Sequence, residues 1–205
     1  MGLWEQQVVP RVIDKVLGNA QMAEVRVKSL GGLHGTVVEI GFGSGPNVPL
    51  YPDGVERVLA IDPSGVARKL AAGRLAASSI PVEFVGLDGQ RIDLPDDSAD
   101  CALSTWTLCT IPDAVAALRE LRRVVRPGGE LFFLEHGRSP RPNVEKWQHR
   151  LDPVQRRIAG GCHLSRDIPD LITEAGFDVE HLAEFDIAGL AVMSHMYSGV
   201  ARNPA

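Results

Sequence analysis

The sequence lacks the features of several classes of protein. Its 21 Lys and Arg residues form no basic run and are outnumbered by 26 Asp and Glu, which gives a formal net charge of -5, so we expect no nucleic-acid partner. No apolar stretch approaches the ~18 residues of a membrane-spanning helix. The N-terminus shows no basic-then-apolar signal pattern. These absences predict a cytoplasmic protein.

Cysteine is also scarce. Cys101, Cys109 and Cys162 are the only three, too few for a disulfide framework, and no CxxC pair occurs, so a reducing compartment is expected. Cys162 stands beside His163, but no other ligand follows at the spacing typical of a metal site. We therefore predict no metal centre, and we assign Cys101 and Cys109 to the core.

What is present suits one globular unit with a sizeable core. The chain has 205 residues, 44% of them hydrophobic, with no internal repeat and no low-complexity linker. Residues 1–33 carry apolar side chains at helical spacing and predict a helical cap. This cap either covers the edge of the domain, closes over a ligand as a lid, or is an amphipathic segment that seeks a surface. Residues 34–205 form the main domain.

Strands and helices alternate in the main domain, and this order predicts a parallel sheet with helices on both faces. The alternation breaks over residues 138–165, where Pro and Arg are frequent. The last two predicted strands are joined too closely for a parallel crossover, so they should pair antiparallel. The predicted strands are residues 36–40, 57–61, 82–85, 100–104, 130–134, 179–184 and 193–201; the predicted helices are 66–77, 113–125 and 166–175, with 127–129 as a stop after the second.

The first of these strands ends in three alternating glycines, Gly41, Gly43 and Gly45. Glycine tolerates positive φ and has no Cβ, so such a loop can bring its backbone close to a ligand. Pro46 follows where a P-loop requires Lys, and the spacing of a dinucleotide fingerprint also fails. The loop therefore predicts a ligand that lacks phosphates.

Two carboxylates flank this loop and narrow the choice of ligand. Glu39 precedes the loop and could meet a cationic amine. Asp62 ends the next predicted strand and could accept hydrogen bonds from both hydroxyls of a ribose. Together they indicate a nucleoside that carries an amino acid.

Four motifs in the right order resemble the class I S-adenosylmethionine-dependent methyltransferases, and they cover about residues 34–135. The resemblance implies a Rossmann-like α/β fold with a seven-stranded sheet of order 3-2-1-4-5-7-6, the last strand antiparallel. It also implies S-adenosylmethionine as methyl donor and S-adenosylhomocysteine as product. The motifs are Glu39–Gly45, Ala60–Ser64, Gly86–Gly89 with Leu94 and Pro95, and Arg123–Gly129 with Leu131–Leu134.

The same resemblance implies roles for individual residues. The three loop glycines would admit the methionine end of the cofactor, and Asp62 would bind the ribose, with Pro63 and Ser64 lining the adenine pocket. Asp88 and Gly89 match the position that meets the adenine edge, although a surface turn remains the alternative for Asp88. The backbone of Thr105 would meet the cofactor's amino acid.

A narrower resemblance, to the alkyl-thiol methyltransferase branch, covers most of the chain after residue 34. It is carried by Ser104–Pro112, Phe133–His136, Trp147–Pro153 and Gly161–Arg166. That branch methylates small thiols, so it implies a small-molecule acceptor bound near an insertion at 138–165. Its members carry an N-terminal membrane anchor, and nothing in this sequence indicates a membrane contact.

His136 is the first candidate for an acceptor-side base or orienting group, with a hydrogen-bonded structural histidine as the alternative. A thiol is partly ionised near neutral pH, so it needs no strong base, whereas a hydroxyl acceptor would need one. Two other functions stay open at this point. One is methylation of a lipid amine or quinone at a membrane surface, and the other is binding of S-adenosylmethionine without catalysis.

Overall fold

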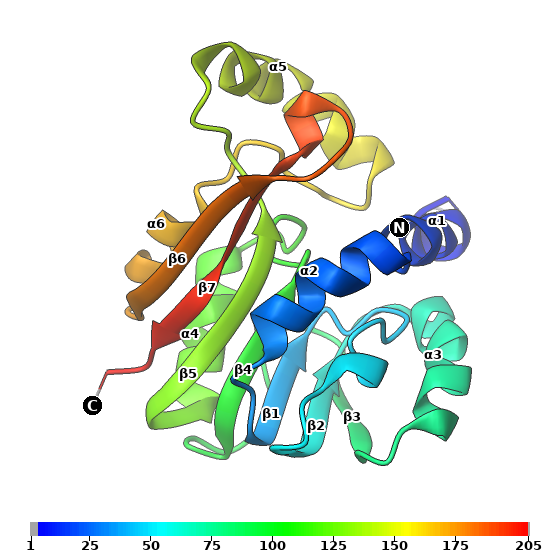
Figure 1. Cartoon of the computed structure of the whole chain (residues 1–205), viewed down its shortest axis with the longest axis vertical. Helices are drawn as coiled ribbons and strands as arrows, with labels where there is room; N and C mark the ends of the chain where they lie inside the picture. Colours follow the sequence, from blue (N-terminus) through cyan, green and yellow to red (C-terminus); the bar gives the residue numbers. More distant parts are fainter. Residues whose placement is uncertain (1–3, 205) are drawn as a thin grey trace.

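A computed structural model describes residues 4–204, so the first three residues of the predicted 1–33 cap and the last residue of the predicted 34–205 domain lie outside the described residues. A seven-stranded sheet of order β3-β2-β1-β4-β5-β7-β6 forms the centre of the molecule (Figure 1). β7 pairs antiparallel with both β5 and β6, which confirms the predicted strand order and the antiparallel last strand. The strands are β1 Gly35–Ile40, β2 Val55–Ile61, β3 Val82–Gly86, β4 Ala99–Thr105, β5 Val125–His136, β6 Asp178–Asp186 and β7 His195–Arg202.

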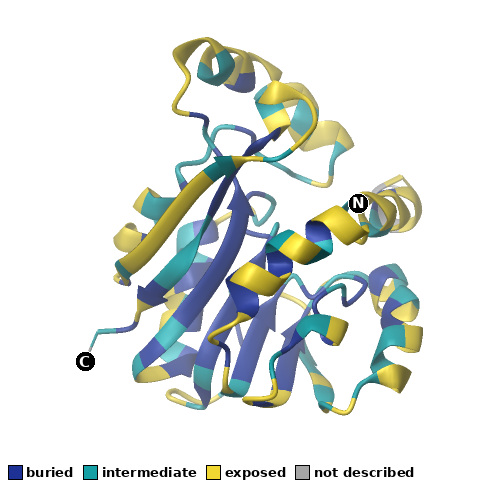
Figure 2. Cartoon of the chain, viewed as in Figure 1, coloured by how far each residue is buried: buried dark blue, intermediate teal, exposed yellow. Residues whose placement is uncertain are grey.

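Helices cover both faces of this sheet. On one face α4 (Ala114–Val124) and α6 (Ile168–Glu174) pack against Val38 and Ile40. On the other face α2 (Ala20–Leu30) and α3 (Gly65–Ala77) share a core with Val37. Successive strand side chains point to opposite faces, so burial of both faces explains the nearly continuous apolar strands. Figure 2 shows the central strands as the most buried part of the fold.

Two predicted boundaries were wrong. The stop at Pro127–Gly129 does not separate helix from strand, because β5 begins at Val125 directly after α4 and absorbs these residues at a register irregularity against β4. The helix predicted over 166–175 begins at Ile168, because the Asp167 side chain accepts a hydrogen bond from the Asp170 backbone amide and caps the first turn.

The insertion predicted at 138–165 is largely a helix, α5 (Pro142–Ile158), which has Pro153 in its interior. It stands above the sheet beyond the end of β5 (Figure 1). Gln148 is its buried residue and holds it in place: the side-chain amide accepts from Ser139 N at 2.8 Å and donates to Gly137 O at 3.0 Å. Asp152 is a second anchor, because it accepts hydrogen bonds from Leu164 N and Ser165 Oγ, so polar contacts hold the helix more than a packed core does.

The N-terminal segment comprises a π-helical turn, Trp4–Val8, then α1 (Val9–Leu17) and α2. Asp14 joins α1 to two other elements. It accepts hydrogen bonds from Ser44 Oγ of the glycine loop at 2.5 Å and from Arg74 Nη1 of α3 at 2.9 Å. Short 3-10 turns, Val48–Leu50 and Ala191–Met193, complete the described elements. Among residues 4–204, no helix is both long and apolar enough to cross a membrane.

Candidate active site

The glycine loop leaves β1 at the carboxyl edge of the sheet. Gly41, Gly43 and Gly45 have φ angles of 67, 59 and 72°, a region that strains other residues. A Cβ on Gly41 would overlap the Thr107 side chain, so this glycine lets two loops meet. At Gly43 the backbone conformation, not crowding, favours glycine, because the nearest atom to a Cβ there is 3.8 Å away.

Asp62 lies beside this loop, at the end of β2. Its carboxylate accepts hydrogen bonds from Gly43 N and Ser64 N, each at 2.7 Å. Burial raises the pKa of Asp62 against the effect of these two bonds. Ser64 in turn caps α3 through the Ala67 amide, and Pro63 lies between the two residues. A carboxylate offers about four acceptor positions, so Asp62 retains capacity for a ligand.

Glu39 and Thr105 are brought together by Asn47, a residue that the sequence motifs did not single out. The Asn47 amide donates to Glu39 Oε1 at 2.8 Å and to Thr105 Oγ1 at 3.1 Å. The Tyr51 hydroxyl also donates to Glu39. Burial raises the pKa of the Glu39 carboxyl to about 7.

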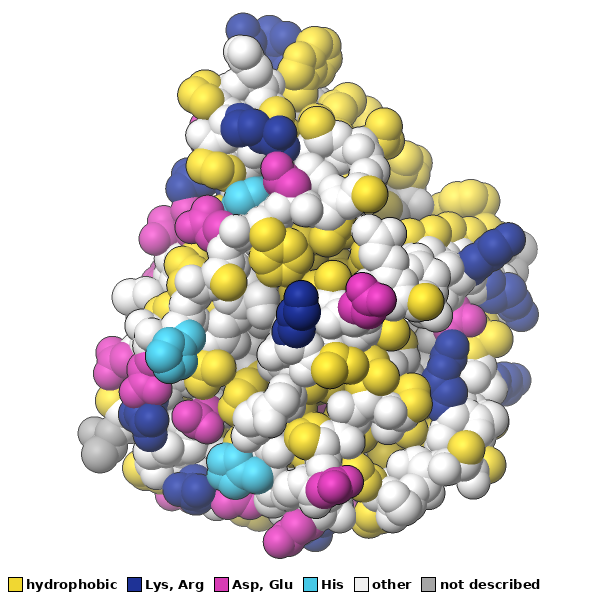
Figure 3. Space-filling view, in the orientation of Figure 1, with side chains coloured by type: hydrophobic (Ala, Val, Ile, Leu, Met, Phe, Trp, Pro, Cys, Tyr) yellow, Lys and Arg dark blue, Asp and Glu magenta, His cyan; other side chains and the backbone are white. Residues whose placement is uncertain are grey.

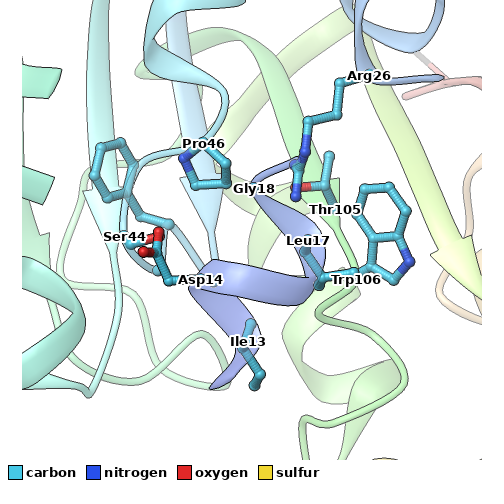
Figure 4. Close-up of a pocket in the computed structure, with 12 residues that line it drawn as sticks. Ile13, Asp14, Leu17, Gly18, Arg26, Ser44, Pro46, Thr105 and Trp106 are labelled. Carbon is cyan, nitrogen blue, oxygen red and sulfur yellow. The ribbon is translucent and has the colours of Figure 1, made fainter. Parts of the chain in front are cut away.

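Arg26, from α2, is the most important residue that sequence reasoning missed. Its side chain is only 2% exposed, and Nη1 donates to Asn47 Oδ1 at 2.6 Å and Thr105 Oγ1 at 3.0 Å. The guanidinium stands 4.5 Å from the centroid of the Trp106 ring (Figure 4). Its Nε has no hydrogen-bond partner among the described residues. Burial lowers the pKa of Arg26 to about 10, so the group stays cationic.

A cavity of about 60 Å³ lies between α1 and the glycine loop, and Arg26, Thr105 and Trp106 also line it. Figure 4 shows Asp14 directed toward Ser44 and Arg26 directed toward Thr105. Ligand pockets usually enclose roughly 300–1,000 Å³, so this cavity, with α1 as one wall, is smaller than a nucleoside needs. The lining residues are Ile13, Asp14, Leu17, Gly18, Arg26, Gly41, Phe42, Gly43, Ser44, Pro46, Thr105 and Trp106.

Asp88 and Gly89 follow β3. Asp88 is exposed and accepts hydrogen bonds from the Gln90 side-chain amide at 3.0 Å and the Gln90 backbone at 2.9 Å, which lower the pKa of Asp88. Gly89 lies against the sheet, where a Cβ would be 3.4 Å from Ile40 Cγ2. Asp88 therefore lies in a surface turn closed by Gln90, at the end of β3.

The loop after β4 is held from two sides. Glu135, fully buried at the end of β5, accepts from Ser104 Oγ at 2.7 Å and from Thr107 N at 2.9 Å, and burial raises the pKa of Glu135 to about 7. Arg166 donates to the carbonyl oxygens of Leu108 and Ile111. Within the described contacts, Arg166 therefore supports the backbone rather than a carboxylate.

His136, the predicted acceptor-side residue, lies in a cluster with Cys109 and Cys162. Its side chain is buried, Nε2 stands 3.4 Å from Val192 O, and Nδ1 has no hydrogen-bond partner among residues 4–204. The two sulfurs and a ring nitrogen all lie within 4.8 Å of one another. Proximity to the Cys109 thiol, and then to the His136 ring, lowers the pKa of Cys162.

Sequence spacing did not reveal this cluster, because its members come from three separate segments. His163, which the sequence places beside Cys162, bonds instead to the Cys109 carbonyl through its backbone amide at 2.7 Å. The expectation of no metal centre considered local spacing only.

Comparisons with known proteins agree with this geometry. A family model described as "Methyltransferase domain" matches residues 38–133. The thiol S-methyltransferase TMT1B of Rattus norvegicus is 34% identical over 146 residues, 69% of this chain and 59% of that protein. Human thiol S-methyltransferase TMT1A is 31% identical over 169 residues, which cover 79% of this chain and 68% of the human protein. A solved S-adenosylmethionine-dependent methyltransferase of Thermotoga maritima, possibly a histamine N-methyltransferase, superposes with a TM-score of 0.70 at 20% identity, covering 99% and 100%.

The chain therefore belongs to the class I S-adenosylmethionine-dependent methyltransferases, as the four sequence motifs predicted. This family uses S-adenosylmethionine and yields S-adenosylhomocysteine. Within it, thiol S-methyltransferases are among the curated relatives at moderate identity. The chain spans 59% of the length of the rat relative.

Proposed function

We propose that the protein transfers a methyl group from S-adenosylmethionine to a small-molecule thiol. One observation carries this proposal: the short loop after β4 has polar, charged surroundings at Thr105 and a cluster of sulfur and imidazole at Cys109. The first environment suits a zwitterionic nucleoside, and the second suits a soft acceptor atom. Both stand at the carboxyl edge of the sheet, where open α/β folds bind ligands.

The cofactor side fits S-adenosylmethionine, which supplies an electrophilic methyl group on a cationic sulfur. The unpaired Nε of buried Arg26 is suited to bind the carboxylate of its methionine end. Glu39 and Thr105 are assigned to the amine, the glycine loop to the close backbone approach, and Asp62 to the ribose. Pro63, Ser64, Asp88 and Gly89 stay assigned to the adenine side.

On the acceptor side, the protein's contribution is positioning and exclusion of water. Methyl transfer requires the acceptor atom, the methyl carbon and the donor sulfur in line, and holding this geometry can supply several kcal/mol of the barrier reduction. His136 orients the acceptor or takes its proton, while the rigid loop at 106–112 and α5 enclose it. The cap at 1–33 closes over the cofactor as a lid through the Asp14 contacts to Ser44 and Arg74.

The test is a coupled assay for S-adenosylhomocysteine release across panels of alkyl thiols, phenols, amines and quinones. We expect release with thiols, and loss of that activity in Asp62→Ala because the cofactor no longer binds. Arg119→Gln, on the exposed face of α4, is the matched control and should keep full activity. If calorimetry shows that S-adenosylmethionine binds, but no compound of any panel leads to release of S-adenosylhomocysteine, the non-catalytic alternative is favoured.

A second candidate is methylation of a lipid amine or quinone at a membrane surface. It is favoured by exposed apolar side chains on the two helices near the site, Val12 and Val16 on α1 and Trp147, Leu151, Val154 and Ile158 on α5. Trp4 Nε1 donates to Ile158 O at 3.0 Å and links the two segments. Figure 3 shows hydrophobic side chains gathered toward the upper part of this face.

Co-sedimentation with lipid vesicles tests this second candidate. If it holds, the wild type binds vesicles, and a Val12→Ser, Val16→Ser double variant loses binding while its fold is kept. Absence of binding together with full thiol methylation would rule it out.

A further inference from the structure

Three soft metal ligands meet on the acceptor side. Cys109 lies in the loop after β4, His136 ends β5, and Cys162 lies in the loop after α5, and their ligand atoms are all within 4.8 Å of one another. Cys109 and His136 are buried, whereas Cys162 is half-buried. The cluster is therefore enclosed by protein on one side and accessible on the other.

The orientation of His136 is the second, independent observation. Nε2 faces the Val192 carbonyl at 3.4 Å, and Nδ1 is buried without a hydrogen-bond partner among the described residues. A metal-binding imidazole characteristically donates its other N–H to a carbonyl or carboxylate, which leaves the first nitrogen free for the ion. An unpaired buried ring nitrogen is unfavourable, and a cation would satisfy it.

The three ligand segments are also fixed to one another. Glu135, the neighbour of His136, accepts the Thr107 amide at the start of the loop that carries Cys109. The Cys109 carbonyl accepts the His163 amide at 2.7 Å, and His163 is the neighbour of Cys162. Ligands held in this way lose little further freedom when an ion binds.

The donor set and its size select the ion. Two thiolates and an imidazole are a ligand set of Zn²⁺, and sites with three protein ligands keep a fourth position for water or substrate. Zinc bonds of about 2.3 Å to sulfur and 2.0–2.1 Å to nitrogen place tetrahedral ligand atoms roughly 3.5–4 Å apart. The widest separation in the cluster therefore has to close by at most about 1 Å.

We propose that Cys109, His136 and Cys162 form a three-ligand Zn²⁺ site whose fourth position takes the sulfur of the methyl acceptor. The second half of this proposal rests on the proposed thiol methylation; the zinc site itself does not. In this arrangement His136 positions the acceptor through the metal and does not act as a base.

Methyl transfer at this site needs only the acceptor thiol and S-adenosylmethionine. The acceptor thiol releases its proton to solvent as its sulfur binds zinc, because a metal-bound thiol is deprotonated. The acceptor sulfur then forms a bond to the methyl carbon while the bond from that carbon to the donor sulfur breaks, and the electron pair stays on the donor sulfur. The product is a neutral thioether, a weaker ligand than a thiolate, so it leaves the metal.

Metal content of the purified 205-residue chain tests the zinc site. After incubation with Zn²⁺ and gel filtration, mass spectrometry of the metal should find one zinc per chain in the wild type and little in Cys109→Ala, Cys162→Ala or His136→Asn. Cys101→Ala also removes a buried thiol, and Cys101 belongs to the other group of potential ligands, with His34 and Glu130. This variant therefore distinguishes the two groups, and it should keep its zinc. Zinc lost from Cys101→Ala but kept in the other three variants would overturn the assignment.

A measurement on the wild type guards against variants that fail to fold. Zinc should protect Cys109 and Cys162 from alkylation by iodoacetamide under native conditions, with the sites read by peptide mass spectrometry. Equal labelling of both cysteines with and without zinc, or a Cys109–Cys162 disulfide in a chain that takes up no zinc under reducing conditions, would exclude the site.

Cobalt substitution tests the fourth position and separates the two proposals. The Co²⁺ form should show thiolate-to-cobalt charge transfer, and its visible spectrum should change on addition of an alkyl thiol but not of the matching alcohol. A zinc-free enzyme that methylates thiols at the full rate would overturn the acceptor role while leaving thiol methylation intact. A zinc-loaded enzyme that methylates no thiol would overturn the proposed function while leaving the metal site intact.

Discussion

The two ends of the loop after β4 handle charge in different ways. At Thr105, a buried cation and a buried carboxylate, Arg26 and Glu39, are linked through Asn47 by short hydrogen bonds. At Cys109 the surroundings are sulfur and imidazole. Directional hydrogen bonds to charged groups give affinity for a ligand with fixed charges, whereas a polarizable cluster selects a soft atom. Variants on the first side should therefore change the Kd for S-adenosylmethionine, and variants on the second should change turnover.

The largest effect is expected at Asp62. Asp62→Ala removes the acceptor assigned to two ribose hydroxyls and releases the Gly43 and Ser64 amides. Hydrogen bonds to a charged group contribute roughly 1.5–3 kcal/mol each, so affinity should fall at least ~100-fold. Isothermal titration calorimetry measures this, with Asp53→Ala, in the exposed turn before β2, as the control. Unchanged affinity in Asp62→Ala would remove the ribose assignment.

Arg26→Gln should weaken binding of S-adenosylmethionine by about 10- to 100-fold, because one charge-assisted hydrogen bond to the ligand carboxylate is lost. The discriminating ligand is a decarboxylated analogue of S-adenosylmethionine, which lacks the group assigned to Arg26. The wild type should bind this analogue about as weakly as Arg26→Gln binds S-adenosylmethionine, and the variant should bind the analogue no more weakly than the wild type does. If the variant weakens both ligands equally, Arg26 acts on the fold rather than on the carboxylate.

The buried carboxylates predict a pH dependence of stability. Burial raises the pKa of Glu39 from 4.5 to about 7, so the folded chain holds a proton that the unfolded chain releases at lower pH. The contribution is fully present below about pH 4.5 and declines as the pH rises to about 7, by roughly 3 kcal/mol. Urea unfolding at pH 5 and pH 8 measures it. Glu39→Gln should make this dependence shallower, with the Glu135 contribution left in place, and an equally steep dependence in that variant would assign the effect elsewhere.

Glu135 offers the same test on the acceptor side, because burial raises its pKa from 4.5 to about 7 as well. The two carboxylates thus have similar raised pKa values but different partners: Glu39 holds Asn47, whereas Glu135 holds the Thr107 amide. Glu39→Gln should also weaken binding of S-adenosylmethionine, whereas Glu135→Gln should loosen the 107–109 loop and act mainly on turnover. Comparable losses of affinity in both variants would erase the distinction between the two sides.

The cofactor side was more readable from sequence than the acceptor side, for a physical reason. Gly41, Gly43, Gly45 and Asp62 belong to short motifs set by the turn from a buried strand into a loop, so local spacing reveals them. The parallel sheet followed from the alternating elements in the same way, whereas its strand order was implied by the resemblance to the family. The cluster around His136 has no such local signature, because Cys109 and Cys162 reach it from segments that only tertiary packing brings together.

Arg26 shows the same limit within the cofactor side. In the sequence it is the single arginine of α2, next but one to the exposed Lys28, and nothing in its spacing marks it as buried. Its partners, Asn47 and Thr105, lie on other elements. Long-range polar partners of this kind become visible only once the helix is docked on the sheet.

The smallest effect is expected at the contact between the lid and the glycine loop. Asp14 and Arg74 are both partly exposed, and pairs of that kind contribute roughly 0.2–1 kcal/mol. Asp14→Asn should therefore speed both binding and release of S-adenosylmethionine by about two- to fivefold in stopped-flow fluorescence, with little change in Kd, because the lid opens more often. Lys15→Ala, on the exposed face of the same helix, should leave both rates unchanged. If Asp14→Asn leaves them unchanged as well, α1 does not limit access to the cofactor side.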